Sequence, residues 1–241
     1  MTPLAILILL FIAHLLGDFI FQPSAWVKDR AQNHFRSAQL YWHALIHGLL
    51  AFLAVQDLRQ WLIPVVITVS HLMIDLMKSY QRKNETRWFL ADQFLHFLVI
   101  VILWKYSVGS SYPLPMTSLF EPKPLLYATA FLLLTTPTSY FIGVATMRWR
   151  KKVEDDKKET LKDGGFWIGM LERMLILVFI FLEQLEPIGF LLAAKSVFRF
   201  GELQKTGEKN QTEYVLIGTL LSFGIALVVG TLTRLLITAI R

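Results

Sequence analysis

The chain has 241 residues, 54% of them hydrophobic, and carries 24 Lys and Arg against 18 Asp and Glu. It contains no cysteine, which excludes disulfide bonds and thiolate metal ligands. Apolar runs long enough to cross a membrane, about 20 residues each, recur along the chain and leave no room between them for a sizeable soluble domain. We therefore predict an all-α polytopic membrane protein.

About eight transmembrane helices are predicted from the apolar runs and the Pro, Gly and polar residues between them. They cover approximately residues 3–22, 39–55, 61–80, 86–106, 125–147, 166–185, 187–200 and 213–240. The first run carries Asp18 and lacks both a basic start and a cleavage site, so we expect a retained helix rather than a signal peptide. An amphipathic linker with Trp26 and Phe35 among basic residues follows, and we expect it to lie along the membrane interface.

The predicted organisation has two membrane halves. Residues 1–106 form the first, residues 107–124 a non-cytoplasmic loop, and residues 125–241 the second, with a charged cytoplasmic loop at 148–165. Of the 24 Lys and Arg, 18 lie in or beside the loops that follow odd-numbered helices. The positive-inside rule assigns these loops to the cytoplasm and both termini to the outside.

Each of the first four helices carries two ionisable side chains four positions apart. The pairs are His14 and Asp18, His43 and His47, His71 and Asp75, and Asp92 and His96. Positions i and i+4 share one face of a helix, and a charge that faces lipid is costly, so we expect the pairs to face inward. Because successive helices alternate in direction, all four pairs fall at one depth, near the cytoplasmic boundary.

The pairs also form an internal repeat. The His14–Asp18 pattern matches His71–Asp75, and the His43–His47 spacing aligns with that of Asp92–His96. The repeat predicts two hairpins related by a pseudo-twofold axis along the membrane normal, which together form a four-helix bundle. Helix direction sorts the side chains into a deeper layer of His14, His47, His71 and His96 and a shallower layer of Asp18, His43, Asp75 and Asp92.

Imidazole and carboxylate ligands without thiolate suit a divalent transition metal, with zinc favoured and Mn or Fe as alternatives. Eight ligands exceed one tetrahedral zinc site, which leaves two ions, or one ion with further carboxylates that orient the histidines. Gln22 and Gln93 are predicted to support the ligands by hydrogen bonds. His34, in the basic linker, is expected to contact headgroups or solvent. A buried ion pair or proton relay without metal is the alternative interpretation.

A second polar group is predicted near the cytoplasmic boundary of the second half. Arg173, Lys195 and Arg199 could bind an anionic headgroup, since guanidinium groups contact phosphate or carboxylate through two parallel hydrogen bonds. An interhelical ion pair of Glu172 with Lys195 or Arg199 is the alternative that the sequence leaves open.

These motifs resemble a bacterial family of multi-pass membrane proteins that is classed only as domain of unknown function 3307. The resemblance rests on His14-x-x-Gly17-Asp18, His71-x-x-x-Asp75, Asp92-Gln93-x-x-His96, Leu171-Glu172-Arg173, Ala193-Ala194-Lys195 and Arg199-Phe200. It implies the bacterial inner membrane as location and no particular activity. More loosely, the His/Asp pattern is similar to membrane-bound metal-dependent hydrolases.

The leading hypothesis is a membrane-embedded metal-dependent hydrolase that acts near the cytoplasmic face. Its substrate would be a membrane lipid, of phospholipid or polyprenyl-phosphate type, and nucleic acid is not expected as a partner. Asp92 is the predicted general base, because it breaks the repeat symmetry and lies in the shallower layer. The alternatives are a transporter of divalent cations or protons and a metal-stapled scaffold or sensor.

Overall fold

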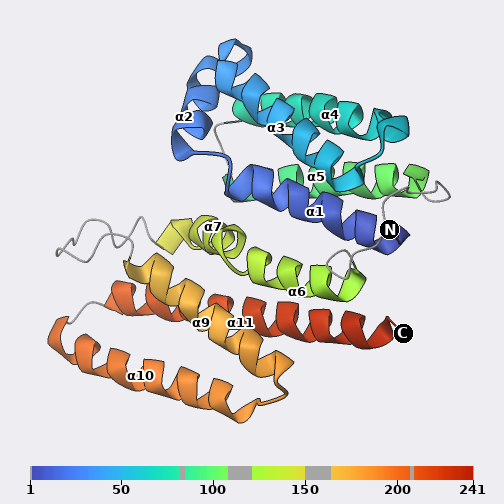
Figure 1. Ribbon diagram of the computed structural model, residues 1–241. Helices are drawn as coiled ribbons and strands as arrows, with labels where there is room; N and C mark the ends of the chain where they lie inside the picture. Colours follow the sequence, from blue (N-terminus) through green and yellow to red (C-terminus); the bar gives the residue numbers. More distant parts are fainter. Residues whose placement is uncertain (1, 82–84, 108–120, 150–163, 207–208, 241) are drawn as a thin grey trace. The chain divides into compact units, whose positions relative to one another are not determined.

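The computed structural model describes residues 2–81, 85–107, 121–149, 164–206 and 209–240 (Figure 1). All regular secondary structure in these ranges is helical, which confirms the predicted all-α class. The chain divides into two compact units, Met1–Thr129 and Ala130–Arg241. Most of the predicted loops at 107–124 and 148–165 lies outside the described residues.

The described part of the first unit holds five complete α-helices, two short 3₁₀ turns and the start of a sixth helix, α6 (Pro122–Leu133). The complete helices and the turns are α1 (Pro3–Phe19), α2 (Ser24–Asn33), η1 (His34–Arg36), α3 (Ala38–Val55), η2 (Leu58–Gln60), α4 (Leu62–Ser79) and α5 (Glu85–Ser107). The hydroxyl of Thr2 caps α1 by accepting a hydrogen bond from the Ala5 amide at 3.2 Å. The amphipathic linker forms α2 and η1, which turn away from α1 by 77°.

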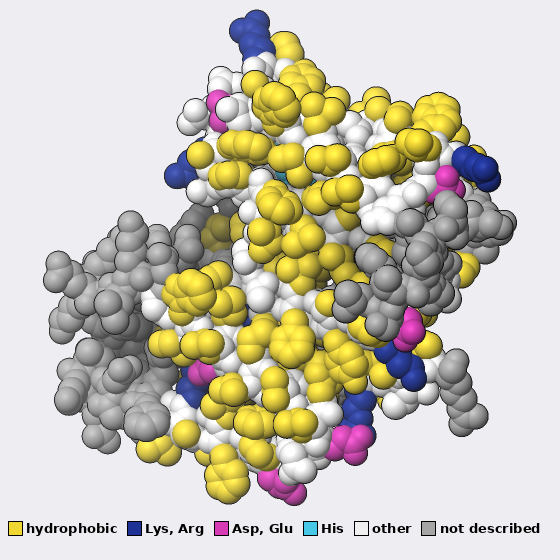
Figure 2. Space-filling view, viewed as in Figure 1, with side chains coloured by type: hydrophobic (Ala, Val, Ile, Leu, Met, Phe, Trp, Pro, Cys, Tyr) yellow, Lys and Arg dark blue, Asp and Glu magenta, His cyan; other side chains and the backbone are white. Residues whose placement is uncertain are grey.

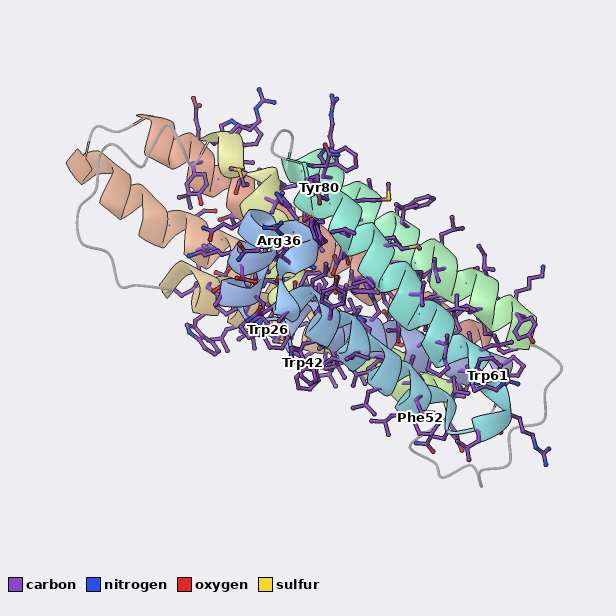
Figure 3. The ribbon with its side chains drawn as sticks, turned by 90° about the horizontal axis from the view of Figure 1, so that it is seen from above. Trp26, Arg36, Trp42, Phe52, Trp61 and Tyr80 are labelled. Atoms are coloured by element: carbon purple, nitrogen blue, oxygen red, sulfur yellow. The ribbon has the colours of Figure 1, made fainter. Side chains whose placement is uncertain are left out.

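Four of these helices, α1, α3, α4 and α5, form a closed ring of helix–helix contacts. α1 packs on α3 and α5, and α4 packs on the same two helices. Apolar side chains fill the half of this group nearer the start of α1, namely Ile6, Leu10, Ala13, Ala51, Ala54, Val55, Ile63, Ile67, Ile100 and Leu103. Figure 3 places Arg36 and Tyr80 at one end of the helices and Trp61 at the other. We call the end with Arg36 the basic end of the first unit. It is the end where α1 and α4 finish and α3 and α5 begin.

The second unit is built around α9. The unit begins within α6, at Ala130. Its other described helices are α7 (Thr136–Ala145), α9 (Gly164–Phe181), α10 (Glu186–Thr206) and α11 (Lys209–Ala239). α9 packs on α7, α10 and α11. The core contains Ala130, Leu134, Ile176, Leu177, Ile180, Ile188, Phe223 and Ala226. Gly230 of α11 allows this helix to approach α9 closely, because a Cβ atom at position 230 would stand 2.6 Å from Cδ1 of Ile180.

The predicted single helix over residues 125–147 is wrong, since the structure divides it into α6 and α7, bent by 40°. Pro137 is the cause, because it has no N–H and its ring would clash with the carbonyl group of Leu133, four residues earlier. The hydroxyl of Thr138 donates to that carbonyl oxygen at 2.7 Å. The break therefore leaves the Leu133 carbonyl satisfied by a side chain instead of an amide.

The outer faces of several helices are apolar and exposed. On α3, Trp42, Leu45, Leu49 and Leu53 recur at helical spacing, and each is more than half exposed. Figure 2 shows hydrophobic side chains over most of the visible face of the described residues. Such faces would be unfavourable in water and are favourable against lipid.

By length and composition, five helices in the described ranges could cross a membrane, or up to seven if each bent pair forms one span. The five are α3, α4 with its preceding turn, α5, α9 and α11, and the bent pairs are α1 with the linker and α6 with α7. α10 is not among them. Several apolar helices thus fit a multi-pass membrane protein, while the count of eight stays a prediction.

Candidate metal centre

The eight predicted ligands converge at the basic end of the first unit. Each side chain is at most 10% exposed, although every one is polar or ionisable. They are His14 and Asp18 from α1, His43 and His47 from α3, His71 and Asp75 from α4, and Asp92 and His96 from α5. The i, i+4 spacing places two of them on the inner face of each helix.

The Asp18 carboxylate lies at the centre of the cluster. Its Oδ1 atom lies close to the Nε2 atoms of three histidines, at 3.2 Å from His43, 3.1 Å from His47 and 3.2 Å from His71. One carboxylate oxygen therefore faces three imidazole rings from two different helices. This oxygen and these nitrogens are all potential metal ligands.

The two rings cannot both donate a hydrogen bond to Asp18 Oδ1 without bringing two N–H donors together. His43 Nε2 and His71 Nε2 lie 3.2 Å from each other, as well as 3.2 Å from Asp18 Oδ1. If both nitrogens carry a proton for Asp18, two donors face each other; if one does not, it cannot donate to Asp18. A cation between the three atoms removes the conflict, because each nitrogen then presents a lone pair.

The other carboxylate oxygen of Asp18 faces a different set of groups. Its Oδ2 lies 3.7 Å from His14 Nε2 and accepts a hydrogen bond from the Gln93 amide nitrogen at 2.7 Å. The Gln93 amide oxygen lies 3.3 Å from His14 Nε2, so this side chain bridges α1 and α5. Its support of metal ligands stays a prediction. We expected Gln22 to continue the helix face of Asp18. It lies beyond the end of α1 at Phe19, in the connection to α2, so it is not on that face.

Several buried atoms of the cluster have no hydrogen-bond partner among the described residues. They are His43 Nδ1, His47 Nε2, Asp92 Oδ1 and His96 Nε2. His47 Nε2 and His96 Nε2 do lie 3.1 and 3.5 Å from carboxylate oxygens, but without the alignment of a hydrogen bond. Buried polar atoms nearly always have a partner. Ring nitrogens that approach carboxylates without this alignment suit ligation of a shared cation.

The ligand atoms fall into three overlapping groups, each within 4.8 Å. The groups are His14, Asp18, His47 and His71; His43, His71 and Asp75; and Asp18, Asp92 and His96. All eight predicted ligands appear, and Asp18 and His71 each occur in two groups. The arrangement can therefore accommodate more than one ion.

The deeper histidines also pack on one another. The rings of His47 and His71 stack at 3.6 Å between centroids, and those of His71 and His96 at 3.9 Å. A small cavity adjoins these rings and His14, and its other walls include Leu10, Ile67 and Ile100 from the apolar core. It has room for about one water molecule.

Two cations, Arg30 and Lys78, contact the cluster; both are among the 18 basic residues that predict the cytoplasmic side. Arg30 of α2 is 6% exposed and its Nη1 donates to Asp75 Oδ2. Lys78 of α4 donates from Nζ to Asp92 Oδ2 at 2.6 Å. The sequence could have indicated Lys78, because it lies three residues after Asp75 and so on the same side of the helix. No local pattern indicates Arg30, because the turn of α2 brings it to the cluster.

His34 lies outside the cluster. Its ring stacks on Tyr80 with centroids 4.2 Å apart, and its Nδ1 lies 3.1 Å from the Ser79 hydroxyl. The predicted role was contact with headgroups or solvent. These contacts fix the linker against the end of α4, and the ring is partly exposed, so headgroup or solvent contact stays a prediction.

The three cations predicted to bind a headgroup belong to the second unit. Arg173 donates to the carbonyl oxygens of Leu134 and Thr135 and to the hydroxyls of Ser139 and Ser222. Lys195 forms an ion pair with Glu172, the alternative that the sequence left open. The Arg199 side chain lies outside the described residues. Arg173 therefore fixes the break between α6 and α7, while headgroup binding by these three cations stays a prediction.

The fold and the cluster define a helical protein with several candidate membrane spans and a buried His/carboxylate centre. Residues 6–121 match the family model described as "Protein of unknown function (DUF3307)", which confirms the resemblance seen in the sequence. The matched segment contains the whole cluster and ends before the motifs of the second half. No curated protein and no solved structure matches the chain.

Proposed function

We propose that the chain is a membrane-embedded metal-dependent hydrolase, with its metal centre at the His/carboxylate cluster. The observation that carries this proposal is the triangle of Asp18 Oδ1, His43 Nε2 and His71 Nε2, with 3.2 Å along every edge. Tetrahedral donors at about 2.05 Å from one zinc ion stand about 3.3 Å apart. Asp75 Oδ2, at 3.4 Å from His43 Nε2 and 3.8 Å from His71 Nε2, is a candidate fourth donor. With all four donors bound, the hydrolytic water would be a fifth ligand of the ion.

A second ion would use the opposite side of Asp18. Asp18, Asp92 and His96 form a group of their own, and His14 Nε2 lies 3.7 Å from Asp18 Oδ2. Because the two oxygens of Asp18 face different ligand sets, this carboxylate is suited to bridge two ions. Zinc is favoured for an N/O ligand set without thiolate, with Mn and Fe as alternatives.

The packing order of the first unit supports the predicted pseudo-twofold bundle. α1 and α4 each pack on α3 and α5, so α1 is opposite α4 and α3 is opposite α5. These are the pairs that the sequence repeat relates. Each ion would then receive ligands from both halves of the repeat.

The apolar core beyond the cluster favours a hydrolase over a transporter. On the side away from Arg30 and Lys78, the described residues next to the deeper histidines include Leu10, Ile67 and Ile100. A route for ions would need polar groups there. The cavity beside the rings offers the space that a hydrolytic water requires.

A bound divalent metal lowers the pKa of a coordinated water toward 7 and polarises the bond under attack. Asp92 remains the proposed general base, in the arrangement with one ion, which leaves its carboxylate free of metal. Lys78 and Gln93 hold its Oδ2, whereas its buried Oδ1 has no hydrogen-bond partner among the described residues. A site near one end of the spans suits an amphiphilic lipid substrate in the bacterial inner membrane, with the basic end toward the cytoplasm and both termini outside.

The test is the metal content of the protein purified without chelator, measured by elemental mass spectrometry. We expect at least one transition-metal ion per chain, lost in a His14→Ala/His71→Ala double variant. His34→Ala is the matched control, because His34 lies outside the cluster, and it should keep the metal. Full metal retention in the double variant would contradict the proposal.

Metal binding together with hydrolysis of phosphoester or phospholipid substrates would complete the test. Metal binding without hydrolysis, but with metal uptake into proteoliposomes, would favour the transporter alternative. Metal binding with neither activity would favour the scaffold or sensor.

A further inference from the structure

The charges at the cluster do not balance when it binds metal. Its three carboxylates face two cations, Arg30 and Lys78, which leaves one net negative charge when the histidines are neutral. One divalent ion changes the net charge to one positive, and two ions to three positive. An uncompensated charge in a buried, low-dielectric site is costly. A metal-loaded centre therefore favours an added anion, either hydroxide from the coordinated water or an anionic group of a bound substrate.

Arg30 is placed to receive that anion. It comes from α2, is 6% exposed, and points into the cluster rather than toward solvent. Of the five N–H groups of a guanidinium, one is hydrogen-bonded to a described residue, through Nη1 to Asp75 Oδ2. The same oxygen lies 3.4 Å from His43 Nε2, where it can serve a metal. Metal ligation by Asp75 would leave the guanidinium donors available.

Lys78 offers the second positive charge at the same end of α4. It lies one helical turn beyond Asp75, and its side chain is 26% exposed while that of its partner Asp92 is 3% exposed. Nζ donates to Asp92 Oδ2, and the ammonium lies 5.6 Å from the centre of the Phe89 ring. Arg30 and Lys78 thus approach neighbouring carboxylates of one cluster, one from α2 and the other from α4.

We infer that Arg30 and Lys78 form a binding site for a phosphoryl group directly at the metal centre. A phosphate monoester or diester carries the required negative charge, and its oxygens fit the fork of a guanidinium and the point charge of an ammonium. This inference rests on the proposed metal centre and names the substrate class as phosphoryl compounds. It also moves anion recognition from the cations of the second unit to two residues beside the ligands.

The test measures binding of inorganic phosphate to the metal-loaded protein by calorimetry. Arg30→Gln and Lys78→Gln should each weaken binding about 10- to 100-fold, the effect of losing a charge-assisted hydrogen bond, at unchanged metal content. Lys28→Gln and Arg36→Gln are matched controls, because both residues are exposed on the same α2–η1 segment. They should bind phosphate like the unaltered protein. Where Arg30→Gln fails to fold, Arg30→Lys keeps the charge but lacks the fork, and it should weaken binding as well.

Vesicles containing phosphatidic acid provide the second arm and identify the source of the phosphoryl group. Tighter binding of phosphatidic acid than of inorganic phosphate, with the same dependence on Arg30 and Lys78, assigns a lipid headgroup. Equal affinities assign a free phosphate compound. Both results support the phosphoryl site.

Two results would overturn the inference while the metal centre stands. One is phosphate affinity that neither substitution changes in protein that holds its metal. The other is metal content that falls in step with phosphate binding, which would make Arg30 and Lys78 positioning residues for Asp75 and Asp92. Protein that binds no metal at all would contradict the proposed function as well.

Discussion

Gly17 on α1 lies directly against the imidazole ring of His47 on α3. A Cβ atom at position 17 would overlap His47 Nε2 and Cε1 and would lie 2.9 Å from Cδ2. The glycine next to Asp18 therefore makes room for a ring of the neighbouring helix. It is part of the site although it has no ligand atom.

Gly17→Ala should displace the His47 ring and destabilise the first unit by about 1–3 kcal/mol, as overpacking of a filled core does. We expect a lower melting temperature together with a lower metal content. Thermal unfolding in detergent and elemental mass spectrometry measure the two effects. Gly218→Ala on α11 is the control, since a Cβ there meets nothing within 4 Å. Alanine at this helical position should be neutral or stabilise by up to about 1 kcal/mol. Unchanged metal in Gly17→Ala would show that the His47 ring is not required.

Asp92→Asn tests the general base. Asparagine keeps the shape and one acceptor but cannot take a proton. If Asp92 is the base, turnover should fall about 100-fold or more, while metal content and melting temperature change little. Gln93→Glu adds a carboxylate at the adjacent position and should not restore the activity of Asp92→Asn. Joint loss of metal and stability in Asp92→Asn would instead make Asp92 a structural ligand.

Arg173→Lys tests the role of the guanidinium in the second unit. A lysine cannot reach both carbonyl groups at the α6–α7 break, those of Leu134 and Thr135, as well as the two hydroxyls. Each buried carbonyl left without a donor costs about 1–3 kcal/mol, so the melting temperature should fall while metal content stays the same.

Arg234→Lys is the control for this substitution. Its ion pair with Glu183 is solvent-exposed, with the two side chains 40% and 68% exposed, and such pairs contribute at most about 1 kcal/mol. An Arg173→Lys variant as stable as Arg234→Lys would argue against a structural role and would reopen headgroup binding.

Cysteine labelling tests the orientation, because the chain contains no cysteine of its own. Single cysteines at Arg59 and Gln184 should react with an impermeant maleimide from outside the inner membrane. A cysteine at Gln81 should react only after permeabilisation. All three positions are exposed. Labelling of Gln81 from outside would invert the topology and place the cluster near the opposite face.

The sequence by itself determined the helical class and the identity of the cluster. Apolar runs of membrane length require helices, since backbone groups in lipid must be paired within the chain. Within those runs, an ionisable pair spaced i, i+4 has one favourable direction, toward the other pairs. This reasoning predicted all eight side chains that the structure brings together, including His43 and Asp92, which break the repeat.

The sequence also contains Pro137, but proline alone does not decide whether a helix continues. The break between α6 and α7 depends on groups that donate hydrogen bonds to the freed carbonyl oxygens. These groups are the hydroxyl of Thr138 nearby and the guanidinium of Arg173 on another helix. A local pattern cannot show a partner that lies 39 residues further along the chain.

Only the tertiary structure decided which groups share which atoms. Periodicity assigns a residue to a face, whereas the division of Asp18 between two ligand sets depends on side-chain positions across four helices. Arg30 contacts Asp75 because α2 turns 77° away from α1, an angle that no spacing in the sequence encodes. Contacts within one helix follow from its repeat, while contacts between elements depend on how their surfaces pack.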